Sequence, residues 1–399
     1  MADNFEQLGV LSDLINRLNE RKINEPTDIQ RKVIPSLAQE NNIFFTSATG
    51  TGKTFAYLLP FLGKMLQETQ KGLRYLIIAP TLELCTQIKG ELDFLLAETE
   101  LKSALLIGSV NIERQIENIK KIKPEIIVGN PNRLLVLAKK KLFRLDNLRF
   151  LVLDEADRLV SDEMINDTRD LCKIIMRSAE KNERKIISAA CSATMNPKNR
   201  EKILETLCIA QADFIESENH EILREKIEHW AIFSEKRRKE QTLRSLLSAI
   251  KGKKKHIKTL VFTSKGDEAA LILSRLQFHH VSAAGLFGKA GKKPLSGAER
   301  KAALDGFRNG SIETLVSTDL AARGLDIQGI THIIALDVPD NSEVYIHRCG
   351  RTARAGKRGI MITIGDETQM RLLSAMEKKL KICVQPKELH YVKICVPEI

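Results

Sequence analysis

Short apolar runs alternate with amphipathic segments along almost the whole chain, and this alternation limits the possible folds. In the first half we expect strands at Ile43–Ser47, Tyr75–Ala79, Ala104–Ile107, Ile126–Val128, Phe150–Leu153 and Ile186–Ala189. Helical segments lie between them, at Glu83–Leu96, Asn111–Lys121 and Glu163–Arg177. Strands that alternate with helices form βαβ units, so the pattern predicts an α/β fold whose parallel sheets are flanked by helices.

The alternation pauses at the polar stretch 217–221 and then resumes. Further strands are expected at Glu228–Phe233, Thr259–Phe262, Val281–Ala283, Thr314–Val316, Ile333–Leu336 and Ile360–Ile364, with helices such as Lys236–Ile250 and Asp267–Gln277. A chain of 399 residues is long enough for two or three domains. We therefore expect two tandem domains, at residues 1–217 and 226–399, joined by a linker at 218–225.

Composition excludes several classes of protein. Hydrophobic residues make up 43% of the chain, which is too many for a disordered protein. No apolar run approaches the roughly 18 residues of a membrane-spanning helix, and the acidic start Met1–Glu6 does not resemble a secretory signal. The seven cysteines include no C-x-x-C pair, which indicates reduced thiols in a cytoplasmic protein.

The formal net charge of +12 is unevenly distributed along the chain. Residues 218–399 contain 32 Lys and Arg against 21 Asp and Glu, so nearly all of the excess lies there. A basic half is typical of proteins that bind a polyanion such as nucleic acid, and it is also compatible with an ordinary solvated surface. Charge alone leaves both interpretations open.

The most specific motif is a glycine-rich stretch between an apolar run and a helical segment. It reads Ser47-Ala48-Thr49-Gly50-Thr51-Gly52-Lys53-Thr54. A strand, a glycine-rich turn, Gly-Lys-Thr and a helix are the context of a P-loop, in which backbone N–H groups and the helix N-terminus hold phosphates. Lys53 would reach the β- and γ-phosphates of ATP, and the Thr54 hydroxyl would hold Mg²⁺.

An acidic motif supplies the partner that a P-loop needs. The expected strand Phe150–Leu153 runs directly into Asp154-Glu155-Ala156-Asp157. A carboxylate that follows a buried strand lies at the carboxyl edge of the sheet, where open α/β sheets bind their ligands. Asp154 would hold Mg²⁺ through water, and Glu155 would orient and deprotonate the attacking water.

These motifs resemble those of the DEAD-box RNA helicases of helicase superfamily 2, whose signature is the sequence at 154–157. The resemblance extends from Phe5, which matches an isolated upstream aromatic, to about Gly356. It implies two RecA-like domains, each a parallel sheet flanked by helices, with ATP and single-stranded RNA bound across the cleft between them.

The resemblance also assigns residues to ATP binding, hydrolysis and coupling. Gln30 would read the adenine edge, and Ile23 stands where the family has an aromatic that stacks on adenine. In the second domain, Asp326 would contact the ribose, and Arg351 and Arg354 would be arginine fingers. The residues expected to link hydrolysis to strand separation are Asp157, Ser192, Thr194 and His347.

The resemblance is weaker in the RNA-facing motifs of the first domain. The expected RNA contacts are Pro80, Thr81, Gly108, Arg133, Thr263 and Thr318. The family's Pro-Thr-Arg-Glu-Leu-Ala reads Pro80-Thr81-Leu82-Glu83-Leu84-Cys85, its Gly-Gly pair reads Gly108-Ser109, and its Thr-Pro-Gly-Arg reads Asn130-Pro131-Asn132-Arg133. The motifs for ATP chemistry are therefore intact, whereas the RNA grip of the first domain is altered.

The sequence thus predicts a cytoplasmic, monomeric ATP-dependent RNA helicase that uses ATP and Mg²⁺ and binds RNA with little sequence specificity. Hydrolysis would drive local strand separation or remodelling of ribonucleoproteins. Two alternatives remain. One is an ATP-gated RNA clamp that scarcely unwinds duplexes, which the altered motifs favour; the other is a different P-loop protein, such as a DNA translocase or a small-molecule ATPase.

Overall fold

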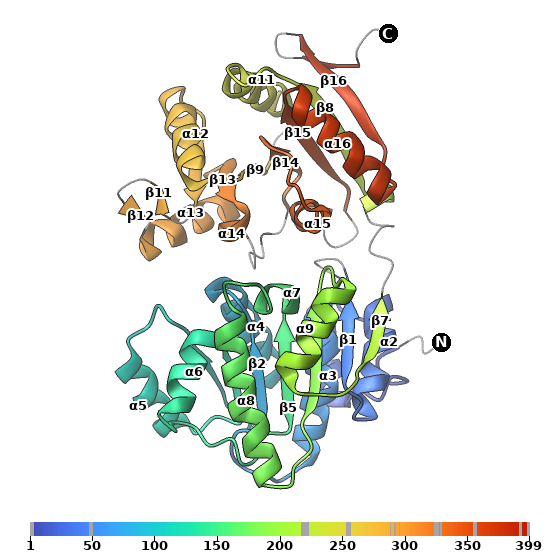
Figure 1. Cartoon of the computed structure of the whole chain (residues 1–399), viewed down its shortest axis with the longest axis vertical. Helices are drawn as coiled ribbons and strands as arrows, with labels where there is room; N and C mark the ends of the chain where they lie inside the picture. The colour runs from blue at the N-terminus through green and yellow to red at the C-terminus, as the bar shows by residue number, and fades with distance from the viewer. Residues whose placement is uncertain are drawn as a thin grey trace. The chain divides into compact units, whose positions relative to one another are not determined.

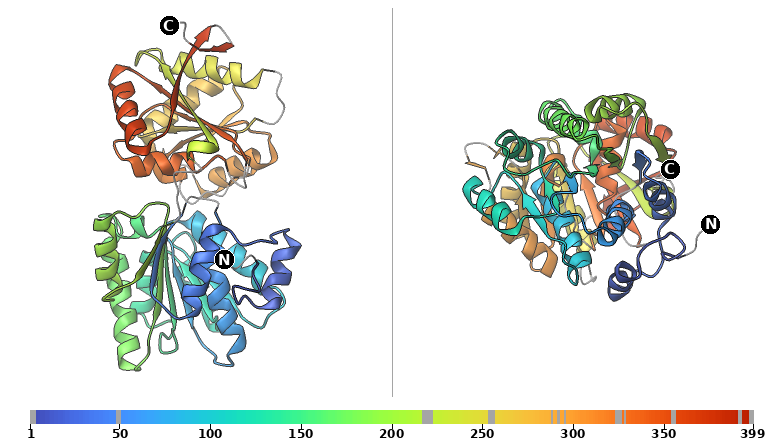
Figure 2. Two further views of the ribbon diagram at one scale, coloured as in Figure 1. Left: turned by 90° about the vertical axis from the view of Figure 1, so that its right-hand side faces the viewer. Right: turned by 90° about the horizontal axis from the view of Figure 1, so that it is seen from below.

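The computed structural model describes residues 4–47, 51–216, 223–252, 257–287, 289–290, 293–294, 296–322, 327, 329–353, 357–390 and 393–396. The chain divides into two compact units, Met1–Glu218 and Asn219–Ile399. Each unit contains a parallel-dominated sheet with helices on both faces (Figures 1 and 2). The predicted α/β fold class is therefore confirmed.

The first unit contains a seven-stranded parallel sheet in the order β3-β4-β2-β5-β6-β1-β7. The strands are β1 (Ile43–Thr46), β2 (Tyr75–Ile78), β3 (Ser103–Leu106), β4 (Ile126–Gly129), β5 (Phe150–Asp154), β6 (Ile187–Ser192) and β7 (Asp213–Glu216). The sequence predicted the first six. It did not predict the edge strand β7, because its residues are exposed or half-buried and form no apolar run.

Helices cover both faces of this sheet. They are α1 (Ser12–Glu20), α2 (Asp28–Ala38), α3 (Lys53–Gln67), α4 (Leu82–Leu96), α5 (Ile112–Ile122), α6 (Pro131–Lys139), α7 (Ala156–Leu159), α8 (Ile165–Lys181) and α9 (Pro197–Leu207). Successive residues of β5 alternate between two hydrophobic clusters: Val152 belongs to one, and Leu151 and Leu153 belong to the other. A strand buried on both faces needs apolar side chains at every position, which explains the continuous apolar run.

The second unit contains an eight-stranded sheet in the order β10-β13-β9-β14-β15-β8-β16-β17, in which only the β16–β17 pair is antiparallel. Its strands are β8 (Ile227–Phe233), β9 (Thr259–Thr263), β10 (Ala283–Leu286), β13 (Thr314–Thr318), β14 (His332–Ala335), β15 (Gly359–Gly365), β16 (Val384–His390) and β17 (Lys393–Cys395). A separate small ribbon pairs β11 (Lys289–Ala290) with β12 (Lys293–Pro294).

The helices of this unit are α11 (Lys239–Lys251), α12 (Gly266–Phe278), α13 (Gly297–Asn309), α14 (Asp319–Ala322), α15 (Ser342–Cys349) and α16 (Glu367–Leu380). β10 begins two residues later than the predicted strand Val281–Ala283. The pair β16–β17 was not predicted, since its residues are half-buried or exposed and form no continuous apolar run. None of the helices in the described part of the chain combines the length and apolar character needed to cross a bilayer.

Candidate functional site

The glycine-rich motif joins the carboxyl end of β1 to the start of α3. Gly52 caps the helix with a φ of 88°, a left-handed conformation that favours glycine. Lys53 and Thr54 occupy the first turn of α3, where the backbone N–H groups and the helix dipole favour phosphate. Ser47, in the position of the usual first glycine, shares a 2.6 Å hydroxyl–hydroxyl hydrogen bond with Thr51. The predicted residues Ala48, Thr49 and Gly50 lie outside the described residues.

The Lys53 ammonium lies against the base of this loop. Its Nζ donates a 2.6 Å hydrogen bond to the backbone oxygen of Ser47. Burial lowers the pKa of Lys53, while the negative charges of Asp154 and Glu155 act in the opposite direction. The structure therefore places the predicted phosphate-binding cation beside the predicted acidic residues.

Asp154 ends β5, and hydrogen-bond donors surround its buried carboxylate. The Tyr57 hydroxyl donates to Oδ2 at 2.8 Å, while the backbone N–H of Glu155 donates to Oδ1 at 2.8 Å. The Cys191 thiol, on the adjacent strand β6, donates to Oδ1 at 3.2 Å. Burial and the nearby Asp154 raise the pKa of Tyr57 well above its usual value, so the phenol stays protonated and can donate.

This arrangement fits a carboxylate that holds Mg²⁺ through water. Both oxygens of Asp154 already accept protein hydrogen bonds, so an intervening water suits the site better than direct coordination of Mg²⁺. The Thr54 side chain, the other predicted ligand, belongs to the first turn of α3. Among the residues that the structure describes, no group of three His, Cys, Asp or Glu side chains forms an all-protein metal cage.

Of the two remaining acidic residues in the motif, one contacts the end of β6. Glu155 follows β5 with φ 48° and ψ 51°, a left-handed conformation that costs free energy in a residue other than glycine. Ser192 ends β6, and its hydroxyl donates a 2.6 Å hydrogen bond to Asp157. The backbone N–H of Thr194 donates to the Ser192 oxygen at 3.3 Å. The predicted coupling residues of this unit are therefore in direct contact.

Gln30 contacts the phosphate loop from α2. Its Nε2 donates to the backbone oxygen of Gly52 at 3.0 Å, and its Oε1 accepts from the backbone N–H of Thr27 at 2.9 Å. Ile23 is half-buried and packs against the hydrophobic cluster on the α2–α3 face of the sheet. Phe5 is buried within the same cluster. The two hydrogen bonds of Gln30 fix its position relative to the phosphate loop.

The predicted RNA-facing residues Thr81 and Arg133 of the first unit make hydrogen bonds within the unit itself. Thr81 caps α4, because its hydroxyl oxygen accepts from the backbone N–H of Leu84 at 3.2 Å. Arg133, on α6, donates to the backbone oxygens of Gly108 and Val110, each at 3.0 Å, and to Gln115 Oε1 at 2.9 Å. We therefore see Arg133 as a brace of the 108–110 loop.

Two further positions lie on either side of Thr81 in the sequence. Pro80 precedes Thr81 at the end of β2 and is buried. Leu82, where the family has arginine, is 40% exposed, so an apolar side chain replaces a cation on this surface.

In the second unit, Thr263 and Thr318 end neighbouring strands and are direct partners in the register of β9 and β13. His347 lies within α15, and Arg351 follows the helix with only 4% of its surface exposed. Both belong to the motif that resembles the arginine-finger motif. The predicted residues Asp326 and Arg354 lie outside the described residues.

A buried arginine that we did not predict organises this region. Arg348 donates two hydrogen bonds to Asp319, at 2.7 and 2.8 Å, and forms a 2.7 Å ion pair with Asp337. Burial opposes the charge, but the two carboxylates outweigh it and raise the pKa of Arg348. Arg348 therefore joins α15 to α14 and to the end of β14.

Comparisons with known proteins show the family of the chain. The model of the DEAD/DEAH box helicase family matches residues 27–203, and that of the helicase conserved C-terminal domain matches residues 238–356. The DEAD-box ATP-dependent RNA helicase CshC of Bacillus cereus is 35% identical over 365 residues, covering 92% of this chain and 88% of that protein. CshA of Bacillus subtilis is 32% identical, covering 96% and 73%.

Solved structures show the same fold. Mss116p bound to ssRNA and AMP-PNP is similar with a TM-score of 0.85 and 23% identity, covering 96% of this chain and 78% of that chain. S. cerevisiae Dbp5 bound to RNA and ADP BeF3 has a TM-score of 0.83 and 24% identity, covering 97% and 96%. The two sheets are thus tandem RecA-like domains, as predicted. The chain belongs to the family of DEAD-box ATP-dependent RNA helicases.

Proposed function

We propose that this protein binds ATP with Mg²⁺ at the carboxyl edge of the first sheet and couples hydrolysis to the opening or remodelling of RNA. The observation that carries the proposal is that the phosphate loop and the acidic motif lie near each other, close enough for their charges to interact. Lys53 begins α3, Asp154 ends β5 and Glu155 follows it, and the two carboxylates influence the charge of Lys53. A cation and carboxylates that lie near one another at this edge suit the binding of a nucleoside triphosphate and its metal ion.

In this proposal, Lys53 and the backbone N–H groups of the first turn of α3 hold the phosphates of ATP. Thr54 and, through water, Asp154 would hold Mg²⁺, which would neutralise developing charge on the phosphates. Glu155 would accept a proton from the attacking water. Gln30 would hydrogen-bond the adenine edge while it contacts Gly52.

Arg351 and Arg354 would act on the transition state from the second unit, and Asp326 would hold the ribose. A planar guanidinium that carries its charge at every relevant pH stabilises the charge that develops on the transferred phosphoryl group. The hydrogen bond from Ser192 to Asp157 offers a physical link between the acidic motif and the end of β6. We propose that this link and His347 transmit the state of the nucleotide.

RNA would contact Pro80, Thr81 and Gly108 of the first unit and Thr263 and Thr318 of the second. Arg133 would shape this surface through its hydrogen bonds to the 108–110 loop. We further propose domain boundaries at residues 217 and 226 around the linker 218–225, a monomeric state, and a cytoplasmic location, which suits the free thiols of the chain.

Replacing Glu155 with Gln tests the chemistry. Glutamine keeps the size of the side chain but removes the proton acceptor, so we expect ATP binding to persist while turnover falls by roughly 10²–10⁴-fold. A fluorescent ATP analogue measures binding, and phosphate release in the presence of RNA measures turnover. Normal hydrolysis by the variant would show that Glu155 is not the base.

A second candidate function is an ATP-gated clamp on RNA that opens few duplexes. It is favoured by the exposed apolar side chain of Leu82 and by the internal hydrogen bonds of Arg133. Displacement of a labelled strand, measured beside ATP turnover, separates the two functions. A clamp hydrolyses ATP when RNA is present but releases little strand, whereas a helicase does both.

A further inference from the structure

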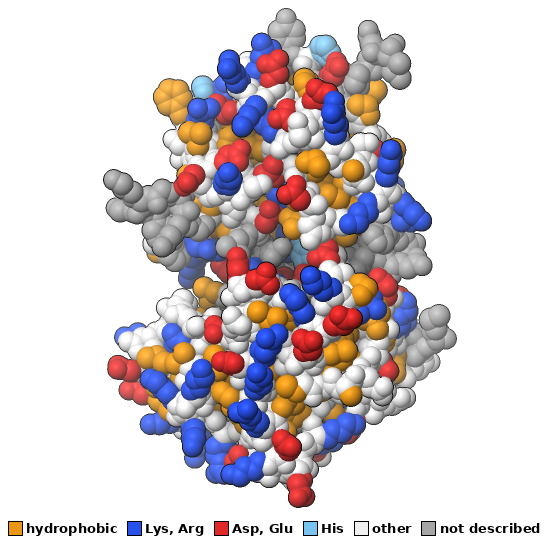
Figure 3. Space-filling model, in the orientation of Figure 1, with side chains coloured by type: hydrophobic (Ala, Val, Ile, Leu, Met, Phe, Trp, Pro, Cys, Tyr) orange, Lys and Arg blue, Asp and Glu red, His pale blue; other side chains and the backbone are white. Residues whose placement is uncertain are grey.

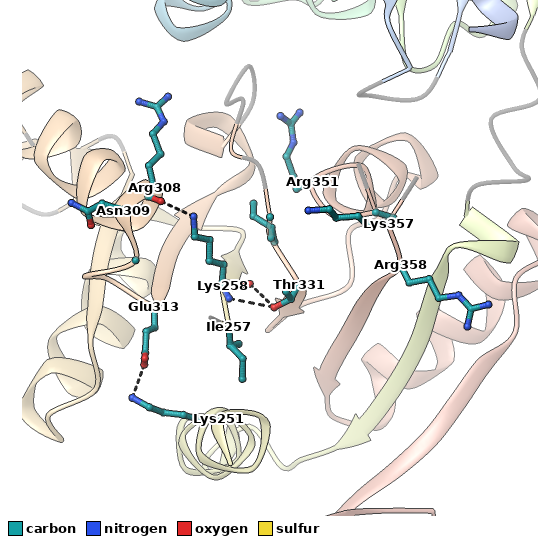
Figure 4. A pocket seen from close by; sticks show the side chains of 14 residues that line it. Lys251, Ile257, Lys258, Arg308, Asn309, Glu313, Thr331, Arg351, Lys357 and Arg358 are labelled. Carbon is teal, nitrogen blue, oxygen red and sulfur yellow. Dashed lines mark hydrogen bonds and ion pairs between the residues drawn. The ribbon is translucent and has the colours of Figure 1, made fainter. Parts of the chain in front are cut away.

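The second unit has a pocket of about 680 Å³ at the amino ends of four neighbouring strands, β13, β9, β14 and β15 (Figure 4). Its wall includes the residues that precede these strands and the ends of two helices. The lining residues include Ile257 and Lys258 before β9, Gly329–Thr331 before β14, Lys357 and Arg358 before β15, Lys251 of α11 and Arg308 of α13. No residue expected to contact RNA lines this pocket.

The charge of the lining is strongly one-sided. Apart from Arg351, which the proposed function assigns to ATP hydrolysis, the cations are Lys251, Lys258, Arg308, Lys357 and Arg358, and Glu313 is the one acidic residue in the described part of the lining. Lys251 forms a 2.6 Å ion pair with Glu313, and Arg308 lies 3.5 Å from Asp305. Figure 3, by contrast, shows Lys and Arg interspersed with Asp and Glu over the face in view. The pocket therefore concentrates positive charge, whereas the face in view mixes positive with negative charge.

Hydrogen bonds from side chains to backbone oxygens order the wall of the pocket. The Lys258 ammonium donates a 2.8 Å hydrogen bond to the backbone oxygen of Arg308. The Thr331 hydroxyl donates to the backbone oxygen of Lys258 at 3.1 Å, and the Thr352 hydroxyl donates to that of Ile330 at 2.6 Å. Figure 4 shows Lys258 between Arg308 on one side and Lys357 with Arg351 on the other. The charged groups thus extend from the ends of a rigid sheet.

We propose that this pocket binds backbone phosphates of single-stranded RNA. These phosphates would lie outside the RNA segment that the predicted RNA-binding residues contact. The proposal rests on the proposed function and extends it to a second RNA surface. The apolar residues of the described lining are Ile257, Ile330 and Ala353, so this part of the pocket offers cations for phosphates and no aromatic side chain on which a base could stack.

The position of the pocket predicts a dependence on RNA length. β9 and β13 have five residues each, so their two ends are separated by roughly 16 Å at 3.3 Å per residue. Thr263 and Thr318 lie at the carboxyl ends, and the pocket lies at the amino ends. An RNA that reaches only the two threonines cannot reach the pocket, whereas a longer strand can continue to it.

The test compares two RNAs of related sequence on the full chain, by fluorescence anisotropy with a non-hydrolysable ATP analogue. The short RNA is trimmed to the shortest length that binds; the long one extends it at both ends. The variant carries Arg308→Gln, Lys357→Gln and Arg358→Gln. The control carries Lys378→Gln, Lys379→Gln and Lys381→Gln at the end of α16, three exposed lysines with the same loss of charge.

We expect the long RNA to bind the wild type more tightly than the short one and to lose this gain in the pocket variant. The dependence of log affinity on log salt should become shallower by about 2 for the long RNA, at roughly 0.7 per lost phosphate contact. Short-RNA binding and the ATP turnover that it stimulates should stay unchanged.

Three results would overturn the proposal: a wild type that gains nothing from the extension, a pocket variant that keeps the gain, or a control variant that loses as much. Pyrophosphate that binds the wild type and not the variant, while long-RNA binding is unaffected, would assign the pocket to a small polyphosphate instead. Failure of the proposed function looks different, because short RNA would then stimulate no ATP turnover.

Discussion

The carboxyl edge of the first sheet has two halves that are built differently. On β1, β5 and β6, the polar groups converge on one carboxylate, that of Asp154, which accepts hydrogen bonds from Tyr57 and Cys191. On β2, β3 and β4, Arg133 donates its hydrogen bonds to the 108–110 loop. We call these the nucleotide half and the RNA half.

The difference shows where the chain retains the family pattern and where it departs from it. A site that stabilises a transition state needs groups held in place before the reaction, so the nucleotide half has little freedom to change. Binding of an RNA backbone depends on many weak phosphate contacts, and these can be redistributed over the surface. The departures at Leu82, Ser109 and Asn132 belong to the RNA half, whereas those on the nucleotide side, Ile23 and Ser47, leave Lys53, Asp154 and Glu155 in place.

The largest expected effect is that of Arg351→Ala on turnover. Loss of a guanidinium that acts only in the transition state should lower kcat by roughly 10³-fold or more, with ATP affinity nearly unchanged. Single-turnover hydrolysis and equilibrium binding measure the two quantities. A variant that raises only the KM for ATP would show that Arg351 contributes to ground-state binding instead.

Tyr57→Phe should have the next largest effect, because it removes one donor to Asp154. A hydrogen bond to a charged group contributes about 1.5–3 kcal/mol, so turnover should fall by roughly 10- to 100-fold if this bond orients the carboxylate. The concentration of Mg²⁺ that gives half-maximal turnover should rise. A titration of turnover with Mg²⁺ measures both.

Tyr75→Phe is the matched control. It removes another buried tyrosine hydroxyl, one that donates at 3.3 Å to the backbone oxygen of Tyr57 and does not contact Asp154. Equal losses in the two variants would mean that the hydroxyl of Tyr57 acts through packing alone, and that the nucleotide half is less organised than the hydrogen bonds indicate.

In the RNA half, Arg133→Ala should weaken RNA binding by roughly tenfold, because the 108–110 loop loses several hydrogen bonds of about 0.5–1.5 kcal/mol each. The KM for ATP should not change. Arg133→Lys distinguishes a brace from a phosphate contact, since lysine keeps the charge but cannot reproduce the planar set of donors. RNA binding restored by lysine would contradict the bracing role.

Ile23→Phe should have the smallest effect. An aromatic ring against the adenine face should add about 0.5–1.5 kcal/mol of stacking, which tightens ATP binding by about two- to tenfold. The preference for ATP over GTP should stay, because Gln30 would still pair with the adenine edge. An unchanged or raised KM for ATP would mean that Ile23 acts only through its packing against the core.

Residues adjacent in sequence explain why much of the site could be predicted. The P-loop and the acidic motif are each contiguous, and each follows an apolar strand, so their place at a sheet edge follows from the pattern. Tyr57 and Asp154 are 97 positions apart, and the pattern around Tyr57 is that of an ordinary buried helix. Its contact with Asp154 depends on how α3 packs against β5.

The same reasoning applies to Arg348 and to the edge strands. Arg348 is 29 positions from Asp319, and the sequence does not show that one arginine joins α14 to the end of β14. The strands β7, β16 and β17 lie at or near the edges of their sheets, where partial exposure removes the continuous apolar run that identified the central strands.

The central claim is that the nucleotide half hydrolyses ATP in response to bound RNA. The most direct test is ATP turnover by the full chain as a function of added single-stranded RNA, compared with DNA of the same length and sequence. We expect RNA to raise turnover in a saturable way and DNA to have little effect. Turnover that ignores RNA, or that DNA stimulates equally, would contradict the claim.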